Sequence, residues 1–245
     1  MSQPRRIVAI VPAGGCGRRF GGDSNKLFAL LDGQPLWVHT ARTLLEHPDV
    51  TECIMPVAEG DESQFQAQAF QHELTAEATR KSLRFVRGGS DRTASVAAGL
   101  AAVVDDCCNY VAIHDAARPL VHHQDLTNVF NRAQETGAAM LATPVSGTLK
   151  RVQDGQVTAT VPRQQIWVAL TPQVFELSIL RDAYARHRGR AATDDAELVE
   201  RAGGEVAIVP GSPDNIKITV PEDLAIAEAM LQARNTRVAE TMEAD

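Results

Sequence analysis

A glycine-rich stretch near the N-terminus has the composition of a loop that binds phosphate groups. The sequence PAGGCGRR at residues 12–19 follows an apolar run at residues 7–11, and Lys26 comes shortly afterwards. Glycine lets the backbone approach a ligand closely, so that several N–H groups can converge on phosphate oxygens. Arg18, Arg19 and Lys26 add positive charge that suits phosphate binding. The stretch therefore predicts a polyphosphate site, with a solvated glycine-rich turn as the alternative at this point.

Two better-known phosphate loops do not fit this sequence. A P-loop requires glycine immediately before the lysine and serine or threonine after it, whereas Asn25 and Leu27 flank Lys26. The dinucleotide-binding fingerprint requires a third glycine three residues after the second, but Arg-Arg-Phe follows Gly17. These mismatches argue against a P-loop enzyme and against a hydride-transfer enzyme.

Small polar residues follow the apolar run at residues 83–86. The sequence GGSDR occupies residues 88–92, and Ser95 comes soon after it. Close backbone approach at Gly89 and the hydroxyl groups of Ser90 and Ser95 suit a base or a ribose. An ordinary turn with a helix cap would use the same residue types, so both interpretations stay open.

A carboxylate and a guanidinium follow the apolar run at residues 110–114. They belong to the sequence HDAAR at residues 114–118. Asp115 could meet a metal ion, a metal-bound water or a substrate hydroxyl, and Arg118 could hold a phosphate. An internal ion pair between these two residues is the alternative.

Two further cations have ambiguous settings. Lys217, in the sequence DNIK at residues 214–217, alternates with apolar residues, and such a lysine either reaches a ligand or extends to solvent. Arg163 follows a predicted β-hairpin, where surface charge is the ordinary interpretation. Neither residue indicates chemistry by itself.

These residues together predict transfer of a nucleotidyl group. Cations and N–H groups would stabilise charge on the α-phosphorus in the transition state and on the departing pyrophosphate. An acceptor phosphate is already anionic, so it can attack in line without a covalent nucleophile from the protein. Mg²⁺ bridging the triphosphate oxygens is the expected cofactor.

Apolar runs alternate with helical patterns from residue 7 to residue 143, which indicates an α/β fold. Buried parallel strands are predicted at residues 7–11, 53–57, 83–86, 110–114 and 138–143, and helices at residues 35–46, 62–74, 93–104 and 124–136. Right-handed crossovers then give a Rossmann-like, mostly parallel twisted sheet with helices on both faces. Ligands of such sheets bind beyond the carboxyl ends of the strands, and the polar clusters at residues 12–19, 88–92 and 114–118 each follow a strand end.

The pattern changes after Pro144. Asp154-Gly155 between residues 148–153 and 156–161 is typical of a tight hairpin, so an inserted β-arm is expected at about residues 145–161. Such an arm can pair with a second subunit, which predicts a homodimer, or it can remain solvated. Further helices are expected at residues 172–187, 194–202 and 221–233, and a strand at residues 206–209. Residues 1–234 are expected to form a single domain, followed by a flexible C-terminal tail at residues 235–245.

Composition limits the class of protein. A chain of 245 residues with 44% hydrophobic content suits one α/β domain. The formal net charge of −7 argues against general binding to nucleic acid or to an anionic membrane. The cysteines form no C-x-x-C pair, and there is no secretory or membrane-length apolar segment. These features predict a cytoplasmic protein.

Seven short motifs resemble, in order, those of the 2-C-methyl-D-erythritol 4-phosphate cytidylyltransferases, enzymes of the non-mevalonate isoprenoid pathway. They are residues 12–19 with Lys26, residues 88–92 with Ser95, and residues 114–119, 160–163, 170–173, 193–194 and 214–217. The resemblance covers about residues 5–232 and implies a nucleotidyltransferase fold. It also implies that CTP and a polyol phosphate, 2-C-methyl-D-erythritol 4-phosphate, give a cytidine diphosphate product and pyrophosphate, with Mg²⁺ or another divalent cation required.

The resemblance further implies roles for individual residues. Arg19 and Lys26 would stabilise the transition state, and Arg163 and Lys217 would position the acceptor phosphate. The CTP pocket would be lined by Ala13, Gly14, Gly15, Gly17, Gly89, Ser90 and Ser95, and the acceptor pocket by Asp115, Arg118, Thr148 and Thr171. Family members are dimers that exchange hairpin arms, so Thr148 and Arg163 would serve the neighbouring subunit's site.

Three points stay open at the level of sequence. Asp115 is a candidate metal ligand, and phosphate oxygens and water would otherwise hold the ion. Asn25 stands where the family commonly has proline, which predicts a less constrained chain before Lys26. The acceptor could instead be ribitol 5-phosphate or another polyol or sugar phosphate, and a nucleotide sensor without turnover is the alternative from a different class.

Overall fold

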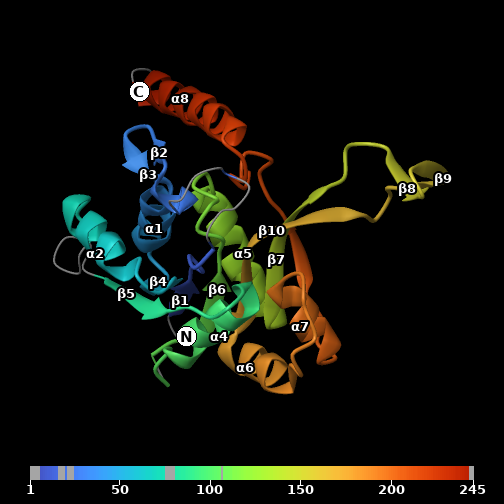
Figure 1. The fold of residues 1–245 in the computed structure, drawn as a ribbon, viewed down its shortest axis with the longest axis horizontal. Helices are drawn as coiled ribbons and strands as arrows, with labels where there is room; N and C mark the ends of the chain where they lie inside the picture. Colours follow the sequence, from blue (N-terminus) through green and yellow to red (C-terminus); the bar gives the residue numbers. More distant parts are fainter. Residues whose placement is uncertain (1–5, 16–19, 21–24, 75–80, 106, 243–245) are drawn as a thin grey trace.

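The computed structural model describes residues 6–15, 20, 25–74, 81–105 and 107–242 of the chain. Within these residues a seven-stranded sheet runs through the centre of the molecule, and helices cover both of its sides (Figure 1). The strand order is β11-β7-β10-β6-β1-β4-β5. The strands are β1 (Ile7–Ile10), β4 (Val50–Val57), β5 (Ser82–Arg87), β6 (Tyr110–Ile113), β7 (Ala138–Pro144), β10 (Trp167–Glu176) and β11 (Ala207–Pro210).

The sheet is mostly parallel, as the sequence predicts. β10 runs antiparallel to both β6 and β7, and the other neighbouring strands pair in parallel. From β1 the chain moves to β4 and β5 on one side and then returns to β6 on the other side. The strand order therefore switches between β1 and β6, the position at which ligands of such sheets bind.

Alternate residues of β1 point to opposite faces of the sheet, as strand geometry requires. Ile7 and Ala9 belong to one hydrophobic cluster and Val8 and Ile10 to another. The first cluster includes residues of α1 (Leu36–Glu46), α2 (Glu62–Gln71) and α5 (His123–Thr136). The second includes residues of α4 (Arg92–Ala101), α6 (Leu177–Arg186) and α7 (Asp195–Arg201). The predicted helices on both faces are confirmed.

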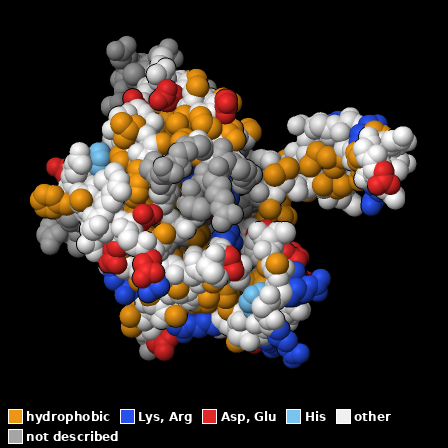
Figure 2. Space-filling model, viewed as in Figure 1, with side chains coloured by type: hydrophobic (Ala, Val, Ile, Leu, Met, Phe, Trp, Pro, Cys, Tyr) orange, Lys and Arg blue, Asp and Glu red, His pale blue; other side chains and the backbone are white. Residues whose placement is uncertain are grey.

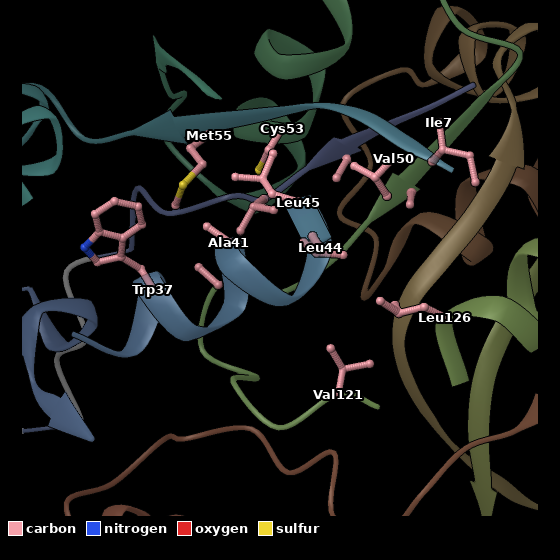
Figure 3. Close-up of a cluster of buried hydrophobic side chains, with 14 of the residues drawn as sticks. Ile7, Trp37, Ala41, Leu44, Leu45, Val50, Cys53, Met55, Val121 and Leu126 are labelled. Atoms are coloured by element: carbon pink, nitrogen blue, oxygen red, sulfur yellow. The ribbon is translucent and has the colours of Figure 1, made fainter. Parts of the chain in front are cut away.

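The core between α1 and the sheet holds β1 and β4 in register. Figure 3 shows Trp37 and Leu45 of α1 facing Met55 and Cys53 of β4, and all four side chains are buried. Burying a large apolar side chain stabilises a fold by roughly 1.5–3 kcal/mol. This packing fixes the strands whose carboxyl ends lead into the cavities described below.

The predicted β-arm is present. β8 (Leu149–Gln153) and β9 (Gln156–Val161) pair antiparallel around Asp154 and Gly155, both of which have positive φ angles. This combination suits the tight hairpin turn that the Asp-Gly sequence predicts. The arm projects away from the sheet and its helices (Figure 1).

The C-terminal helix α8 (Glu222–Met242) lies beside a short N-terminal hairpin of β2 (Leu30–Leu31) and β3 (Gln34–Pro35) (Figure 1). A separate hydrophobic cluster joins them, with Leu31, Ile218 and Ala227 fully buried. The helix continues past the predicted end at residue 233, whereas the assignment of residues 235–245 as a tail outside the domain stays a prediction. None of the described helices has the length and apolar content that a membrane span requires.

The predicted helix at residues 172–187 is wrong in its first part. Residues up to Glu176 complete β10, and α6 begins at Leu177. Val174 and Phe175 are fully buried, because β10 fills the space between β6 and β7. Pro172 lies where the pairing register of β10 shifts, a position at which a strand tolerates proline. Strand pairing over a long sequence distance thus overrides a local pattern that resembles a helix start.

Candidate active site

A cavity of about 280 Å³, the first cavity, opens beyond the carboxyl ends of β1, β5 and β6. Its wall combines glycine backbone, small hydroxyl groups and charged side chains. Of the predicted site residues, the cavity is lined by Gly14, Gly15, Lys26, Gly89, Ser90, Ser95, Asp115 and Lys217. Segments far apart in the sequence therefore meet at the switch in strand order.

The start of the glycine loop is held by the backbone of the neighbouring strand β4. Val11 N donates to Ile54 O at 2.9 Å, and Ala13 N donates to Pro56 O at 2.7 Å. Ala13 is buried and does not line the first cavity, whereas Gly14 and Gly15 do. The loop therefore leaves β1 along the end of β4 and turns into the cavity. Gly17 and Arg19, both predicted as site residues, lie outside the described residues.

Asn25 supplies a constraint that the sequence did not predict. Its Oδ1 accepts from Leu27 N at 3.1 Å, and its Nδ2 donates to Ala13 O at 3.3 Å and to Asp61 Oδ2 at 3.0 Å. These bonds fix the short helix η1 (Lys26–Phe28) against the start of the glycine loop. These side-chain hydrogen bonds restrict Asn25 itself, and the less constrained chain expected before Lys26 stays a prediction.

Lys26 extends from η1 into the first cavity. Its Nζ donates to Ile218 O at 2.7 Å, which places the ammonium group beside the segment that carries Lys217. A lysine amine has three donors, so it can bind a ligand oxygen while keeping such a contact. Two cations from opposite ends of the chain thus line one cavity.

Ser95 and Gly89 form the opposite wall of the first cavity. Ser95 Oγ accepts from Gly89 N at 3.1 Å, and a Cβ placed on Gly89 would lie 2.3 Å from Ala94 Cβ. Asp91 caps the start of α4 by accepting from Ala94 N at 2.8 Å. Only glycine fits this tight turn, which brings the backbone close to any ligand in the cavity.

A second cavity of about 260 Å³ adjoins the first one. The two cavities share Arg92, Asp115 and Lys217. The second cavity is also lined by Arg118, Leu170, Thr171, Thr193 and Asp194. A ligand in each cavity would therefore face its neighbour across Asp115 and the surrounding cations.

Asp115 is surrounded by three cations. Its Oδ2 lies 2.9 Å from Lys217 Nζ and 3.4 Å from Arg118 Nε, and its Oδ1 lies 3.4 Å from Arg92 Nε. Burial alone would raise the pKa of Asp115, but Lys217, Arg92 and Arg118 outweigh burial and hold the pKa far below its usual range. The carboxylate is ionised, and the group of four side chains carries net positive charge suited to an anionic ligand.

The floor of the second cavity is a hydrogen-bonded chain. Thr171 Oγ1 accepts from Asp115 N at 3.1 Å and lies 3.1 Å from His114 Nδ1, while His114 Nε2 lies 3.1 Å from Arg118 O. A neutral His114 with its proton on Nε2 satisfies all of these contacts. Arg118 Nη1 in turn donates to Asn215 O at 2.7 Å. The chain locks the backbone from which Asp115 extends.

Two predicted acceptor residues lie outside both cavities. Thr148 and Arg163 are on or beside the projecting arm, and both are exposed. The guanidinium of Arg163 donates to Ser146 O within the arm. The structure therefore brings together Asp115, Arg118, Thr171 and Lys217, but it does not bring Thr148 and Arg163 to them within one chain.

Sequence reasoning assigned no role to several residues around the second cavity. Arg92 stood inside a recognised motif but was not selected, although its place after two glycines at a strand end was a usable signal. Gln173 stood inside the recognised motif at residues 170–173 without being selected, and Asp195 lay beside the motif at residues 193–194. Tyr184 gave no signal, because its position depends on the packing of α6 against α7.

The described residues do not form a protein-only metal site. No group of three or more His, Cys, Asp or Glu side chains among them is placed to hold a metal ion. Asp115, the predicted candidate ligand, already faces three cations. A divalent ion coordinated by this carboxylate alone would meet their repulsion, so these residues do not fit a resident ion.

The fold and the site define a nucleotidyltransferase-like α/β enzyme, with a glycine loop at the switch in strand order and cations around two adjoining cavities. Comparisons with known proteins give the family. The model described as "IspD: 2-C-methyl-D-erythritol 4-phosphate cytidylyltransferase" matches residues 7–233. The chain belongs to this family, as its motifs predict, and is therefore a nucleotidyltransferase enzyme.

Individual relatives agree with this assignment. The 2-C-methyl-D-erythritol 4-phosphate cytidylyltransferase of Rhodopirellula baltica is 50% identical, over 92% of this chain and 94% of its own length. The enzyme of the same name from Bacillus licheniformis is 40% identical, over 94% of this chain and 98% of its own. The crystal structure of that enzyme from Thermus thermophilus has a TM-score of 0.72 and 31% identity, over 94% of this chain and all of its own.

Burial of His114 predicts a pH-dependent stability. Burial lowers its pKa to about 4 from 6.5, so between these values the unfolded chain binds a proton that the folded protein does not. The contribution of neutral, buried His114 to the free energy of unfolding is therefore fully present above pH 6.5. It is lost as the pH falls toward 4, which lowers this free energy by up to about 3 kcal/mol.

Urea unfolding of the His114→Gln variant measures this contribution. The fall in unfolding free energy between pH 6.5 and 4 should be smaller in this variant than in the wild type. The His72→Gln variant, altered at the end of α2, should keep the wild-type slope. If the unfolding free energy of His114→Gln falls with pH as steeply as that of the wild type, His114 is not the source of the pH dependence.

Proposed function

We propose that this protein transfers the cytidylyl group of CTP to 2-C-methyl-D-erythritol 4-phosphate, which gives 4-diphosphocytidyl-2-C-methyl-D-erythritol and pyrophosphate. The observation that carries the proposal is the pair of adjoining cavities that share Arg92, Asp115 and Lys217. Glycine backbone and serine hydroxyl groups line only the first cavity, Arg118 and Thr171 line only the second, and both cavities carry charged side chains. This division suits a nucleotide and a polyol phosphate, respectively.

The reaction needs no covalent intermediate on the protein. An oxygen of the acceptor phosphate attacks the α-phosphorus of CTP, and the bond from that phosphorus to the bridging oxygen of pyrophosphate breaks. Lys26 is assigned to the α-phosphate, where its ammonium charge stabilises the negative charge of the transition state. Arg19 is assigned the same role from the sequence. Gly14, Gly15, Gly89, Ser90 and Ser95 are assigned to CTP, and Ala13 and Gly17 are assigned to it from the sequence.

The acceptor is assigned to the second cavity. Lys217 and Arg118 provide charge for its phosphate, while Asp115 and Thr171 can accept hydrogen bonds from its hydroxyl groups. The fixed positions of these groups reduce the entropy cost of bringing two anionic substrates together. Positioning and charge neutralisation therefore supply most of the catalysis.

Mg²⁺ is proposed as a companion of the triphosphate. This ion prefers oxygen ligands and keeps several waters, so phosphate oxygens and water suit it better than a carboxylate already paired with cations. The protein's own cations then neutralise the phosphate charge that remains.

The active form is proposed to be a homodimer that exchanges its arms. Figure 2 shows hydrophobic side chains on the projecting arm, where Val152 and Val157 are 57% and 61% exposed. Exposed apolar groups on a protruding hairpin favour pairing with another surface. Exchange would bring Thr148 and Arg163 to the acceptor of the neighbouring chain. A cytoplasmic location is proposed with this function, because both substrates are charged and cross a bilayer at high energetic cost.

The proposed acceptor can be tested directly by paired assays with CTP and Mg²⁺. Pyrophosphate release should be at least about tenfold more efficient, as kcat/KM, with 2-C-methyl-D-erythritol 4-phosphate than with ribitol 5-phosphate, since the acceptor hydroxyl pattern must match buried polar groups. A clear preference for ribitol 5-phosphate would replace the proposed acceptor with the alternative polyol.

Replacing Lys26 should affect the chemical step. We expect Lys26→Ala to lower kcat by about 10²-fold or more with a smaller change in CTP binding, because the charge acts mainly in the transition state. Steady-state kinetics and CTP titration measure the two effects. Lys81→Ala is the matched control, since Lys81 Nζ donates to His47 O away from the cavities. A higher KM for CTP at unchanged kcat would show that Lys26 only binds CTP and does not stabilise the transition state.

Arm exchange predicts complementation between two inactive variants. In a mixed dimer of Lys26→Ala and Arg163→Ala chains, one site would contain only wild-type residues. Mixed dimers purified with two affinity tags should therefore have about half of the wild-type activity, since one of their two sites is intact. No recovery in purified mixed dimers would show that each site uses its own Arg163.

A further inference from the structure

Arg92 occupies the junction between the two cavities and contributes to the wall of both. Its Nε lies 3.4 Å from Asp115 Oδ1, and its side chain is 28% exposed. An arginine in this position interacts directly with the charge of Asp115. Because the guanidinium is planar, its orientation restricts the orientation of the neighbouring carboxylate. What holds Arg92 in place therefore matters for the carboxylate at the centre of the site.

Asp195 holds Arg92 from behind the second cavity. Asp195 Oδ2 lies 2.7 Å from Arg92 Nη2, and the side chain of Asp195 is 1% exposed. Its other oxygen, Oδ1, accepts from the Tyr184 hydroxyl at 2.6 Å. Among the described residues no donor is aligned for a hydrogen bond to Oδ2, so this oxygen depends on the charge of Arg92. The two contacts fix both carboxylate oxygens.

The start of α7 is clamped to β10, which fixes Asp195 itself. Gln173 Oε1 accepts from Asp195 N at 3.1 Å and from Ala196 N at 2.9 Å, and Gln173 Nε2 donates to Asp194 Oδ2 at 2.9 Å. Asp194 Oδ1 also caps the helix by accepting from Glu197 N at 2.9 Å. Gln173 and Thr171 are both on β10, so the same strand holds the start of α7 and lines the second cavity.

Stability alone does not explain this buried arrangement. Burial raises the pKa of Asp195, while Arg92 and Tyr184 act in the opposite direction. A buried ion pair often contributes no more stability than apolar residues of similar size would. Its benefit here is a fixed position for the guanidinium, because Tyr184, Asp195 and the clamp leave Arg92 little rotational freedom.

We propose that Tyr184 and Asp195 are positioning residues that hold Arg92 against Asp115 and thereby set the orientation of the carboxylate in the second cavity. The contacts form a relay from the surface of α6 through α7 to the acceptor side of the site. The relay rests on the proposed assignment of the acceptor to the second cavity. It gives a functional role to a tyrosine that touches neither cavity.

The Tyr184→Phe variant tests the relay, because it removes one hydroxyl group and keeps the ring. Steady-state kinetics with both substrates should show a rise of about 3- to 10-fold in the KM for the acceptor, since a hydrogen bond to a charged group is lost. The KM for CTP should change less than about twofold, although Arg92 and Asp115 also line the first cavity, because the glycine and serine groups assigned to CTP are unaltered. Tyr110→Phe is the matched control, since Tyr110 lies at the opposite end of β6 from Asp115. This control should leave both KM values unchanged.

A double-mutant cycle separates a relay from a general loss of packing. Arg92→Lys keeps the charge but loses the planar contact, and Tyr184→Phe should have little further effect on acceptor KM in that background. If the acceptor KM of the double variant instead rises by the product of the two single-variant factors, the relay is overturned. Equal changes in both KM values, or a lower melting temperature with unchanged kinetics, would also overturn it.

Asp115→Asn distinguishes failure of the relay from failure of the proposed acceptor cavity. If this variant raises the acceptor KM while Tyr184→Phe does not, the relay is wrong and the cavity assignment stands. If Asp115→Asn alters only the KM for CTP, the cavity assignment itself is wrong and the relay falls with it.

Discussion

The site depends on one carboxylate that is surrounded by cations from three parts of the chain. Asp115 follows β6, and its neighbours Arg92, Arg118 and Lys217 come from the start of α4, from its own loop and from the segment before α8. Ionised Asp115 holds these mutually repelling cations together, and the surplus positive charge remains for anionic substrates. The interaction thus fixes the geometry of the site and supplies its charge.

The sheet makes this convergence possible. Strand order switches between β1 and β6, so the glycine loop and Asp115 leave neighbouring strands at the same edge. β10 inserts antiparallel beside β6 and brings Thr171 and Gln173 to the same place. Thr171 supports the backbone of Asp115, whereas Gln173 supports α7. Residues of β10 therefore support the loop that carries Asp115 and the start of α7, which limits reorganisation during the reaction.

Local patterns predicted the parts of the fold that depend on local physics. Apolar runs located β1, β4 and β6, and Asp154-Gly155 located the arm. Residues such as Asp115 and Lys26 were found because their types and their positions after strand ends suit phosphate chemistry. β10 was missed because its pairing with β6 and β7 is a long-range effect, and Tyr184 was missed because only the packing of two helices joins it to Asp195.

A crystal structure of the protein with its proposed product, 4-diphosphocytidyl-2-C-methyl-D-erythritol, tests the central claim most directly. The account predicts that the cytosine and ribose lie in the first cavity against the wall formed by Gly14, Gly89 and Ser95. It also predicts that the methylerythritol hydroxyl groups lie beside Asp115, with its three cations still in place. A polyol bound away from Asp115, or a cytidine bound in the second cavity, would contradict the account.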